Sequence, residues 1–429
     1  MGKLLDQVFQ IRKQDSTIRT EFLAGMIGFF TVAYIIIVNS SILSEVGIPA
    51  RAAVLATIFI SVVGCLLMGI WANVPLVLMP GMGINALFAY NLVQGMGLSF
   101  PVALAAVTIS GGVFMILAFT SLARLLNEAI PLVLKQAITV GLGLFLILLG
   151  LEKGKLIERG GHSLLALGAL DDKMVLATMI TLVITMLLVM RKVPGMFLWS
   201  ILIGTFVGYL FGVNGKVTHG SLSLAPFKEV FLRADFSGMA SISFWTGVFS
   251  MTMVVVFETV GLTYGQTRQL KKEEKLPRVL QVSSFTVFLS GLFGTSPTVS
   301  ALESGSLFAS GAKTGFASVI TACFFLASLL FMPFLTVIPN SAIAPILVII
   351  GMNMLLEFKD MDLTDLADSF SALLIIVLIP FSYSIADGIA IGFIVYPILS
   401  VFTKKTKRPS IVMYVIAALF LLQFVLQWI

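Results

Sequence analysis

Residues 291–305 read GLFGTSPTVSALESG, a hydrophobic segment that glycine, threonine and proline interrupt and that carries one carboxylate, Glu303. Residues 79–90, nearly half a chain earlier, read MPGMGINALFAY and hold Asn85 in the corresponding place. A chain break at membrane depth must be buried in protein or line a cavity, because lipid offers no hydrogen bonds to an open backbone. Two such breaks in corresponding positions of two halves indicate the binding site of a transporter.

The composition is that of a polytopic membrane protein. Hydrophobic residues make up 58% of the chain and charged residues 11%, against roughly 25% charged residues in a typical soluble domain. The net charge of +6 implies no nucleic-acid partner, because an excess of Lys and Arg is expected in cytoplasmic loops. Residues 1–21 are polar and amphipathic and lack the apolar core of a cleavable signal. We expect them to form a cytoplasmic tail at the membrane surface.

The apolar runs predict an all-α fold of about 14 transmembrane segments in two sets of seven. The first set comprises residues 22–43, 52–71, 76–92, 102–122, 134–151, 174–190 and 197–211. The second set comprises residues 244–264, 280–293, the break at 291–305, 316–334, 342–356, 372–385 and 388–402. A last apolar run at 411–429 is either an extra span or an interfacial helix.

Charge and segment number predict how the two sets are oriented. If the N-terminus is cytoplasmic, the main Lys and Arg clusters fall inside, as the positive-inside rule requires, provided that residues 372–402 cross twice and turn at Asp387. An odd number of spans per half makes the halves inverted. An Ile-Pro pair lies about a dozen residues before Gly143 and again before Gly351, a weak internal repeat of the kind found in transporters. The expected organisation is a cytoplasmic tail (1–21), a seven-span repeat (22–213), an extracytoplasmic loop (214–241), a second, inverted seven-span repeat (242–403), and a basic loop with an extra apolar segment (404–429).

Two carboxylates inside the apolar spans are the first candidates for substrate binding and proton coupling. Glu258 stands within MVVVFETVGLTYGQ, and Glu303 follows the second break. A carboxylate at the bilayer centre costs about 2.5 to 3.5 kcal/mol on insertion scales, so it is expected to face a cavity or a partner. Gly261 and Gly265 share a helical face with Glu258, and small residues there let a ligand approach closely. The alternative is a carboxyl group that is merely paired or protonated inside the bundle.

The residues of the breaks are the second set of candidates. Glycine and proline in both breaks, Gly83 among them, let the chain run extended and then start a half-helix, and Thr298 lies in the second break. The free N–H groups at such a start suit the carbonyl oxygens or ring nitrogens of a ligand. Asn85 offers one acceptor and two donors, although it could instead cap the broken backbone. Phe257 is a candidate for stacking on a flat ligand.

Other chemistries find little support in the sequence. No His cluster and no CxxC pair supplies ligands for a metal, so we expect neither metal nor cofactor. No HExxH or GxSxG motif is present, so we expect no enzyme. A channel is a physical alternative, since polar broken helices also form selectivity filters. Tyr34 and Asn39 could line the pathway, with hydrogen bonding in the protein core as an equal alternative.

Six segments carry a recognisable pattern in order along nearly the whole chain. They are FLAGMIGFFTVAYIIIVNSSIL (22–43), LMPGMGINALFAYNLVQGMGLS (78–99), AIPLVLKQAITVGLGLFLILLGL (129–151), VFETVG (256–261), GTSPTVSALESGSLFASGAKTG (294–315) and PFSYSIADGIAIGF (380–393). As a set they resemble the nucleobase-cation symporter-2 superfamily, and within it the AzgA-like branch of purine permeases. The resemblance implies two inverted repeats, a core and a gate domain, and third and tenth spans that are part short strand and part half-helix. It also implies uptake of adenine, guanine or hypoxanthine driven by the proton gradient.

By position, the resemblance assigns Glu258 and Glu303 to the acidic residues of the eighth and tenth spans, and Asn85 to the asparagine of the third-span motif. The AzgA-like branch usually reads Asp-x-x-Asp in the eighth span, and Val255 takes the place of the first acid here. This departure leaves the preferred purine and the coupling residue open. The hypothesis is a purine:proton symporter of the cytoplasmic membrane. The alternatives are a uracil or xanthine symporter and, third, an anion transporter of similar fold; the sequence does not decide whether it is a homodimer.

Overall fold

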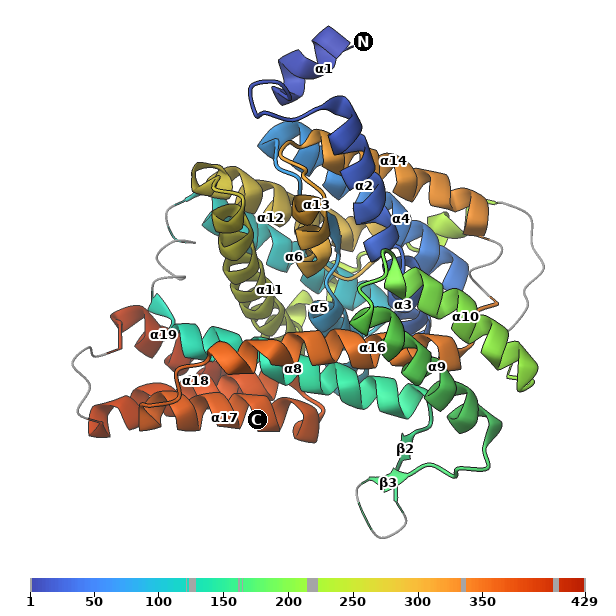
Figure 1. Cartoon of the computed structure of the whole chain (residues 1–429). Helices are drawn as coiled ribbons and strands as arrows, with labels where there is room; N and C mark the ends of the chain where they lie inside the picture. Colours follow the sequence, from blue (N-terminus) through green and yellow to red (C-terminus); the bar gives the residue numbers. More distant parts are fainter. Residues whose placement is uncertain are drawn as a thin grey trace.

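The computed structural model describes residues 2–120, 122, 129–160, 163, 165–213, 223–332, 337–403 and 409–427. Helices dominate this part of the chain (Figure 1). The first half contains α1 (Gly2–Phe9), α2 (Ile18–Val32), α3 (Ile35–Ser44), α4 (Ala50–Leu67), η1 (Met68–Ala72), α5 (Met82–Ala86), η2 (Leu87–Gly95), α6 (Phe100–Phe119), α8 (Leu132–Lys153), α9 (Lys173–Met190) and α10 (Met196–Leu210). The second half contains η3 (Ala225–Glu229), η4 (Phe236–Ala240), α11 (Ile242–Gln269), η5 (Glu273–Lys275), α12 (Leu276–Phe293), η6 (Leu302–Ser304), α13 (Gly305–Ala309), α14 (Phe316–Ala327), η7 (Ser328–Phe331), α16 (Asn340–Leu355), η8 (Leu356–Asp360), α17 (Leu366–Ser382), α18 (Ile385–Phe402) and α19 (Ile411–Gln427). The strands are β1 (Leu78–Pro80), β2 (Ile157–Glu158), β3 (Ala166–Leu167) and β4 (Thr298–Ser300).

Length and apolar composition make this a multi-pass membrane protein. Among the described residues, nine helical segments are long and apolar enough to cross a bilayer, and four shorter apolar helices accompany them. When α19 is set aside and the two interrupted segments are included, the result is the predicted set of fourteen. The first span is divided, because Ala33 and Tyr34 form a turn between α2 and α3.

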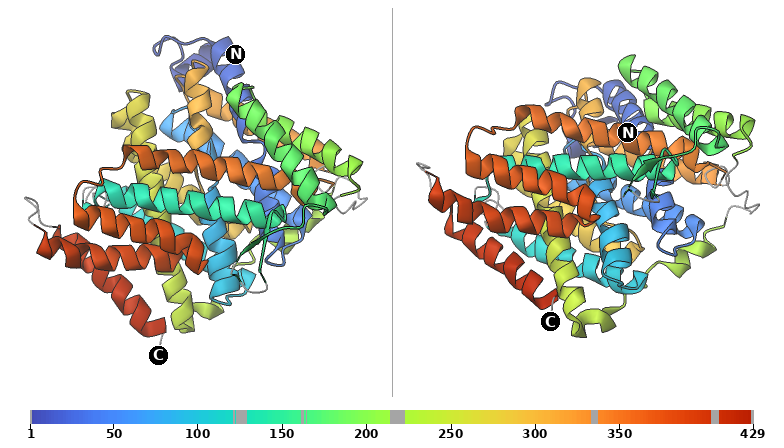
Figure 2. Two further views of the ribbon diagram at one scale, coloured as in Figure 1. Left: turned by 60° about the horizontal axis from the view of Figure 1, so that its bottom comes forward. Right: turned by 90° about the horizontal axis from the view of Figure 1, so that it is seen from below.

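The helices form two groups that pack mainly within themselves. In the core domain, α12 and α11 pack on α6, and α14 packs on α2 and α4. In the gate domain, α16 and α17 both pack on α8, while α9 and α10 pack on each other and on α16. Both views of Figure 2 show α16, α8 and α17 side by side as one layer. This division into core and gate agrees with the expected fold.

The two interrupted segments meet at a short antiparallel sheet inside the core domain. Strand β1 pairs with β4, with Leu78 opposite Ser300 and Pro80 opposite Thr298. The ladder continues at both ends, since the Gly81 amide donates to the Pro297 carbonyl (3.1 Å) and the Ala301 amide to that of Val77 (2.8 Å). Each break therefore supplies the hydrogen bonds that the other lost by leaving the helical conformation.

Two glycines singled out by the internal repeat face each other across the gate domain. A Cβ on Gly143 would lie 2.7 Å from the Gly351 carbonyl oxygen, and a Cβ on Gly351 would lie 2.4 Å from that of Gly143. Helices α8 and α16 can cross this closely only because neither residue has a side chain. The reciprocal contact is what an inverted repeat predicts for two equivalent positions near its symmetry axis.

The end of the molecule that holds α1 is tied together by a polar network, and we call it the N-terminal end. Glu21 is fully buried there, and its Oε1 accepts hydrogen bonds from the backbone amides of Lys313 (2.9 Å) and Thr314 (3.1 Å). The Lys272 ammonium donates to the Lys313 carbonyl at 2.5 Å. The Asn73 amide donates to the carbonyl of Phe9 at 3.0 Å, which holds the N-terminal tail against the core domain.

The opposite end is closed by contacts between core and gate. Lys153, the last residue of α8, forms an ion pair with Glu45, which caps α3. Tyr90 of η2 donates to the other oxygen of Glu45 at 2.7 Å. The hydroxyl group of Tyr383 donates to Glu152, the neighbour of Lys153. Core and gate are therefore fastened together at this end.

The turn between the last two predicted spans lies three residues earlier than expected. We placed it at Ala386 and Asp387, whereas α17 ends at Ser382 and α18 starts at Ile385. Tyr383 makes the turn in the left-handed region, with φ of 57°. The N-cap of α18 is Ser384, whose hydroxyl accepts from the Asp387 amide at 3.2 Å. Asp387 is thus inside the first turn of α18, and its carboxylate is left for another role.

Helix α19, whose fate the sequence left open, runs antiparallel to α18. Phe420 contacts Phe393 of α18 with ring centroids 5.6 Å apart, while Tyr414 shares an apolar groove with Val401 near the other end of α18. The Gln423 amide donates to Ser250 of α11 at 3.2 Å. These contacts favour an extra span over an interfacial helix. The predicted basic run at 404–408, and residues 214–222 of the predicted loop, lie outside the described residues.

Candidate functional site

Side chains from distant spans satisfy most of the polar backbone at the breaks. The Val77 amide donates to Ser304 Oγ at 3.0 Å, and Ser318 Oγ donates to the carbonyls of Val74 and Leu76. The Leu78 amide lies 3.3 Å from Cys65 Sγ, so this buried cysteine contacts β1. The breaks are fixed features of the core domain and need no ligand to hold them.

Asn39 fixes the second break from the first span. Its amide donates to Thr57 (2.7 Å) and Thr295 (3.1 Å), and its oxygen accepts from Ser296 (3.2 Å). All three bonds lie inside the core domain, so the alternative of hydrogen bonding in the protein core is the one observed. Asn39 therefore stabilises the second break through hydrogen bonds inside the core domain.

Asn85 and Thr298, in contrast, have polar atoms without partners. Asn85 lies in α5 directly after the first break and is fully buried, yet neither its Oδ1 nor its Nδ2 has a hydrogen-bond partner in the described chain. The buried hydroxyl of Thr298, opposite Pro80 in the sheet, is also unpartnered. The alternative that Asn85 caps the broken backbone finds no bond to support it. Buried polar groups are normally paired, so these groups indicate a place where a ligand or water binds.

Glu258 adds an unpartnered carboxylate oxygen from α11. Its Oε2 is buried without a hydrogen-bond partner among the described residues, and α11 contacts both α5 and β4. Gly261 and Gly265, on the same face, are exposed, and a Cβ on either would meet no atom within 4 Å. The predicted small-residue face therefore borders open space. Val255, at the position of the missing first acid, is fully buried among apolar residues.

Glu303 differs from Glu258 because it has a partner. The hydroxyl of Tyr34 donates to its Oε1 at 2.5 Å. Tyr34 is fully buried at the turn between α2 and α3, and its ring meets that of Phe197 on α10 edge-on, with centroids 4.9 Å apart. One residue of the first span thus touches both the carboxylate of the tenth segment and a helix of the gate domain.

Gly83 and Phe257, the remaining predicted site residues, lie at contacts between core and gate. A Cβ on Gly83 would be 2.8 Å from Leu142 Cδ1 of α8, so this glycine lets α5 approach the gate closely. The ring of Phe257 stacks on Phe393 of α18 with centroids 5.6 Å apart and planes inclined by 12°. That stack occupies one face of Phe257, and the predicted stacking on a ligand would have to use the other.

Gln266 is a buried residue of this region that the sequence did not single out. It lies two turns beyond Glu258 on α11; its amide donates to the Ala301 carbonyl and its oxygen accepts from Ser300, both at 2.7 Å. These bonds hold α11 against the end of β4. A glutamine near the end of a predicted span gives no signal of such a partner.

The unpartnered groups define the chemistry that the site can perform. A carboxylate accepts hydrogen bonds, an amide both donates and accepts, and a hydroxyl does either. Together they match a small polar molecule that carries both N–H and C=O groups. Within the described ranges, no group of three His, Cys, Asp or Glu side chains could hold a metal ion.

Known proteins share this sequence and this architecture. The Permease family profile matches residues 19–391. The nucleobase transporter PlAzg2 of Paenibacillus larvae is 46% identical over 381 residues, covering 88% of this chain and 76% of that protein. The guanine/hypoxanthine permease PbuO of Bacillus subtilis is 34% identical over 433 residues, covering 97% and 99%. The transmembrane domain of the cyanobacterial bicarbonate transporter BicA superposes with a TM-score of 0.65 at 15% identity, covering 86% of this chain and 97% of that one.

These matches confirm the resemblance to the nucleobase-cation symporter-2 superfamily. The profile begins at α2 and extends into α18, so it includes both interrupted segments and the sheet that joins them. With its two breaks paired in the core and its acidic side chains beside them, this chain belongs to the Permease family of membrane transporters.

Proposed function

We propose that this protein takes up purine nucleobases across the cytoplasmic membrane, together with protons, by alternating access between the core and gate domains. The observation that carries the proposal is the group of unpartnered buried atoms on Glu258, Asn85 and Thr298. The names of the relatives, nucleobase transporter and guanine/hypoxanthine permease, support the class of substrate.

Each predicted residue then has a proposed role. Glu258 accepts ring N–H groups of the base, and Asn85 pairs with a neighbouring N–H or carbonyl. Glu303, held by Tyr34, faces the other edge of the base. Thr298 in the second break and Gly83 in the first break complete the site, together with Phe257, the neighbour of Glu258. We assign proton coupling to Glu258 and Glu303, because no other acidic side chain in the described chain lies beside the breaks.

The proposed orientation places the N-terminus in the cytoplasm. The basic turn between α11 and α12, which includes Lys271, Lys272 and Lys275, lies at the N-terminal end, whereas Lys153 at the opposite end is paired with Glu45. This distribution follows the positive-inside rule. The two repeats are then residues 22–213 and 242–403, and the 214–241 loop is extracytoplasmic.

The conformation supports alternating access. The opposite end is fastened by the Glu45–Lys153 pair, while the α11 face formed by Gly261 and Gly265 is exposed. Since Gly265 is only a turn before the last residue of α11, Gln269, and this end of α11 lies at the N-terminal end of the molecule, we assign this state as open toward the cytoplasm. Movement of the gate against the core would reverse which end is closed.

Uptake of radiolabelled hypoxanthine by cells that express Glu258→Gln tests the proposal directly. Glutamine keeps the size of the side chain but removes the charge and one acceptor, so we expect uptake to fall to background. Glu274→Gln, which makes the same change in the exposed η5 turn of the N-terminal end, is the matched control and should transport normally. Wild-type rates in Glu258→Gln would refute the assignment of the site.

Proton coupling and substrate choice need separate measurements. In proteoliposomes, an imposed inward proton gradient should drive hypoxanthine accumulation, and a protonophore should abolish it; accumulation that ignores the gradient would exclude coupling. Competition by unlabelled adenine, guanine, xanthine and uracil separates the purine hypothesis from the uracil or xanthine alternative. The carboxylates at the site disfavour an anion as the substrate.

A further inference from the structure

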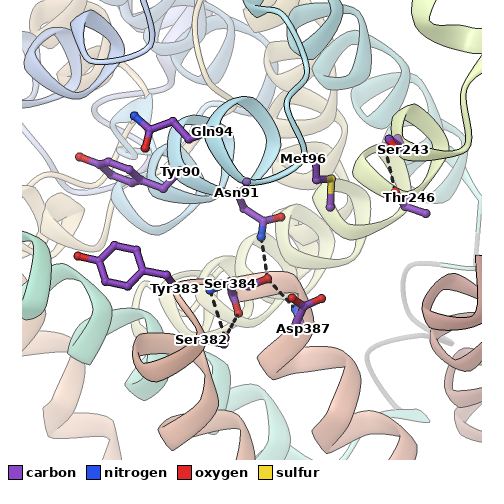
Figure 3. A pocket seen from close by; sticks show the side chains of 11 residues that line it. Tyr90, Asn91, Gln94, Met96, Ser243, Thr246, Ser382, Tyr383, Ser384 and Asp387 are labelled. Carbon is purple, nitrogen blue, oxygen red and sulfur yellow. Dashed lines mark hydrogen bonds between the residues drawn. The ribbon is translucent and has the colours of Figure 1, made fainter. Parts of the chain in front are cut away.

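A cavity lies between core and gate at the end opposite the N-terminus. Its volume is about 620 Å³, within the usual range for small-molecule sites. The lining comes from η2, the start of α11 and the turn between α17 and α18 (Figure 3). The Glu45–Lys153 pair is adjacent, because Tyr90 of the lining bonds to Glu45. The cavity is therefore a separate space on the extracytoplasmic side of the proposed orientation.

The cavity offers hydrogen-bond acceptors. Asn91 is 5% exposed, and its Nδ2 donates to Ser384 Oγ at 2.7 Å, while its Oδ1 has no partner in the described chain. Asp387 bonds to Ser384 only through its backbone amide, which leaves its carboxylate without an ion pair among the described residues. Among the described residues that line the cavity there is no Lys or Arg, so an anion finds no opposite charge there, whereas a molecule with N–H donors finds two acceptors.

The lining also suits a flat molecule. Figure 3 shows the rings of Tyr90 and Tyr383 on one side of the Asn91–Ser384 bond, and Asp387 with Thr246 on the other. Aromatic side chains combined with a few polar groups are typical of sites for small heterocycles. The chemistry matches a neutral planar base with adjacent N–H and C=O groups.

The same two functional groups recur in the proposed central site. Asn85 and Asn91 lie on one continuous half-helix, α5 followed by η2, and each has an unpartnered amide oxygen. A carboxylate accompanies each of them, Glu258 on α11 and Asp387 on α18. The stacked rings of Phe257 and Phe393 lie further along α11 and α18 than the residues of the cavity.

We propose that this cavity is an outer binding site for nucleobases, occupied before the substrate reaches the central site. The inference rests on the proposed function and adds a second site of the same chemical class. Asp387 accepts one N–H group of the base, and the free Oδ1 of Asn91 accepts another. We expect this site to bind the base more weakly than the central site, because no interrupted segment of the chain encloses the ligand here.

Equilibrium binding of labelled hypoxanthine to the purified full-length protein tests this inference. The wild type should show two classes of site, and Glu258→Gln should lose the tighter one and keep the weaker. Asp387→Asn should weaken the remaining class by at least about tenfold, the effect expected for a hydrogen bond to a charged group. Ser243→Trp, which fills the cavity from an exposed position on its rim, should abolish it without removing any native side-chain bond.

Ser400→Ala on α18, away from the cavity, is the matched control and should bind like the wild type. A thermal unfolding curve for each variant separates loss of binding from loss of fold. A single class that Glu258→Gln abolishes, with Asp387→Asn and Ser243→Trp unchanged, would overturn the outer site and leave the proposed function intact. The absence of saturable binding in the wild type would instead overturn both.

Discussion

Replacing Tyr34 by phenylalanine should release Glu303 from the first span while the packing of the ring stays intact. The change removes one hydroxyl, which donates to Glu303 Oε1 at 2.5 Å in a fully buried position. A hydrogen bond to a charged group contributes about 1.5 to 3 kcal/mol net. If Glu303 must be held in place to meet the base, the Kd for hypoxanthine should rise by roughly 10- to 100-fold, since each 1.4 kcal/mol is a factor of ten.

The assay is equilibrium binding to purified protein, with thermal unfolding measured in parallel. Phe197→Leu keeps the Tyr34–Glu303 bond and alters only the ring contact at 4.9 Å. It should lower the unfolding temperature and change the Kd by less than about threefold, because aromatic pairs contribute about 0.5 to 1.5 kcal/mol to packing. Tyr209→Phe, on the exposed surface of α10, controls for the loss of a hydroxyl. A folded Tyr34→Phe variant with wild-type affinity would show that Tyr34 does not position Glu303 for binding.

Three further predictions concern packing and closure. Gly351→Ala should lower the unfolding temperature in detergent, because its Cβ would lie 2.4 Å from a backbone oxygen and overpacking costs about 1 to 3 kcal/mol; Gly112→Ala, which meets no atom closer than 4.0 Å, should not. Gln266→Leu should cost about 1 to 3 kcal/mol for each polar group left unpaired, read as a lower unfolding temperature, and an unchanged one would contradict the bonds to Ser300 and Ala301. Lys153→Met should speed maleimide labelling of Thr246→Cys, a buried position of the cavity lining, from outside by about fivefold, taking 1 kcal/mol for the pair with Glu45, whereas Lys155→Met, which breaks only the exposed pair with Asp172, should leave the rate unchanged.

The parts of the fold that lipid dictates were predictable from the sequence. Clustered glycine and proline at 79–90 and 291–305 favour a break in the helix, and lipid does not tolerate an open backbone, so the two breaks needed partners. The structure gives them each other, as β1 and β4. The repeated spacing drew attention to Gly143 and Gly351, and these two residues are in contact, while the inverted repeat itself stays a prediction.

Contacts between spans far apart in the sequence were not predictable. Tyr34 and Glu303 are 269 positions apart, and Asn39 and Thr295 are 256 apart. Each residue alone is an ordinary polar side chain in an apolar run, with a partner that only the packing of the spans selects. The amino-acid sequence alone contains no signal that Tyr34 contacts a carboxylate.

The misplaced turn between α17 and α18 has a local physical reason. The positive-inside rule required residues 372–402 to cross twice, and the turn was placed at Asp387, but the left-handed residue is Tyr383, a type that rarely adopts this conformation. Ser384 three residues before Asp387 was a usable signal, since serine at the N-cap with an acid at that spacing marks a helix start. The Ser384 amide bonds to Ser382 Oγ at 3.2 Å and not to Asp387, which leaves free the carboxylate on which the outer site depends.

The two acidic residues beside the breaks are in different situations, and this difference indicates how the work is divided between them. Glu303 has a partner in Tyr34, so its position is set whether or not substrate is present. Glu258, Asn85 and Thr298 have buried atoms without partners, and each such group costs about 1 to 3 kcal/mol when left unpaired. A bound base that forms hydrogen bonds with all of these atoms recovers this free energy, whereas a base that forms none with Glu258 recovers less. In the proposed mechanism, selection among bases therefore takes place at Glu258 and Asn85, while Glu303 and Tyr34 connect the occupied site to the gate through Phe197.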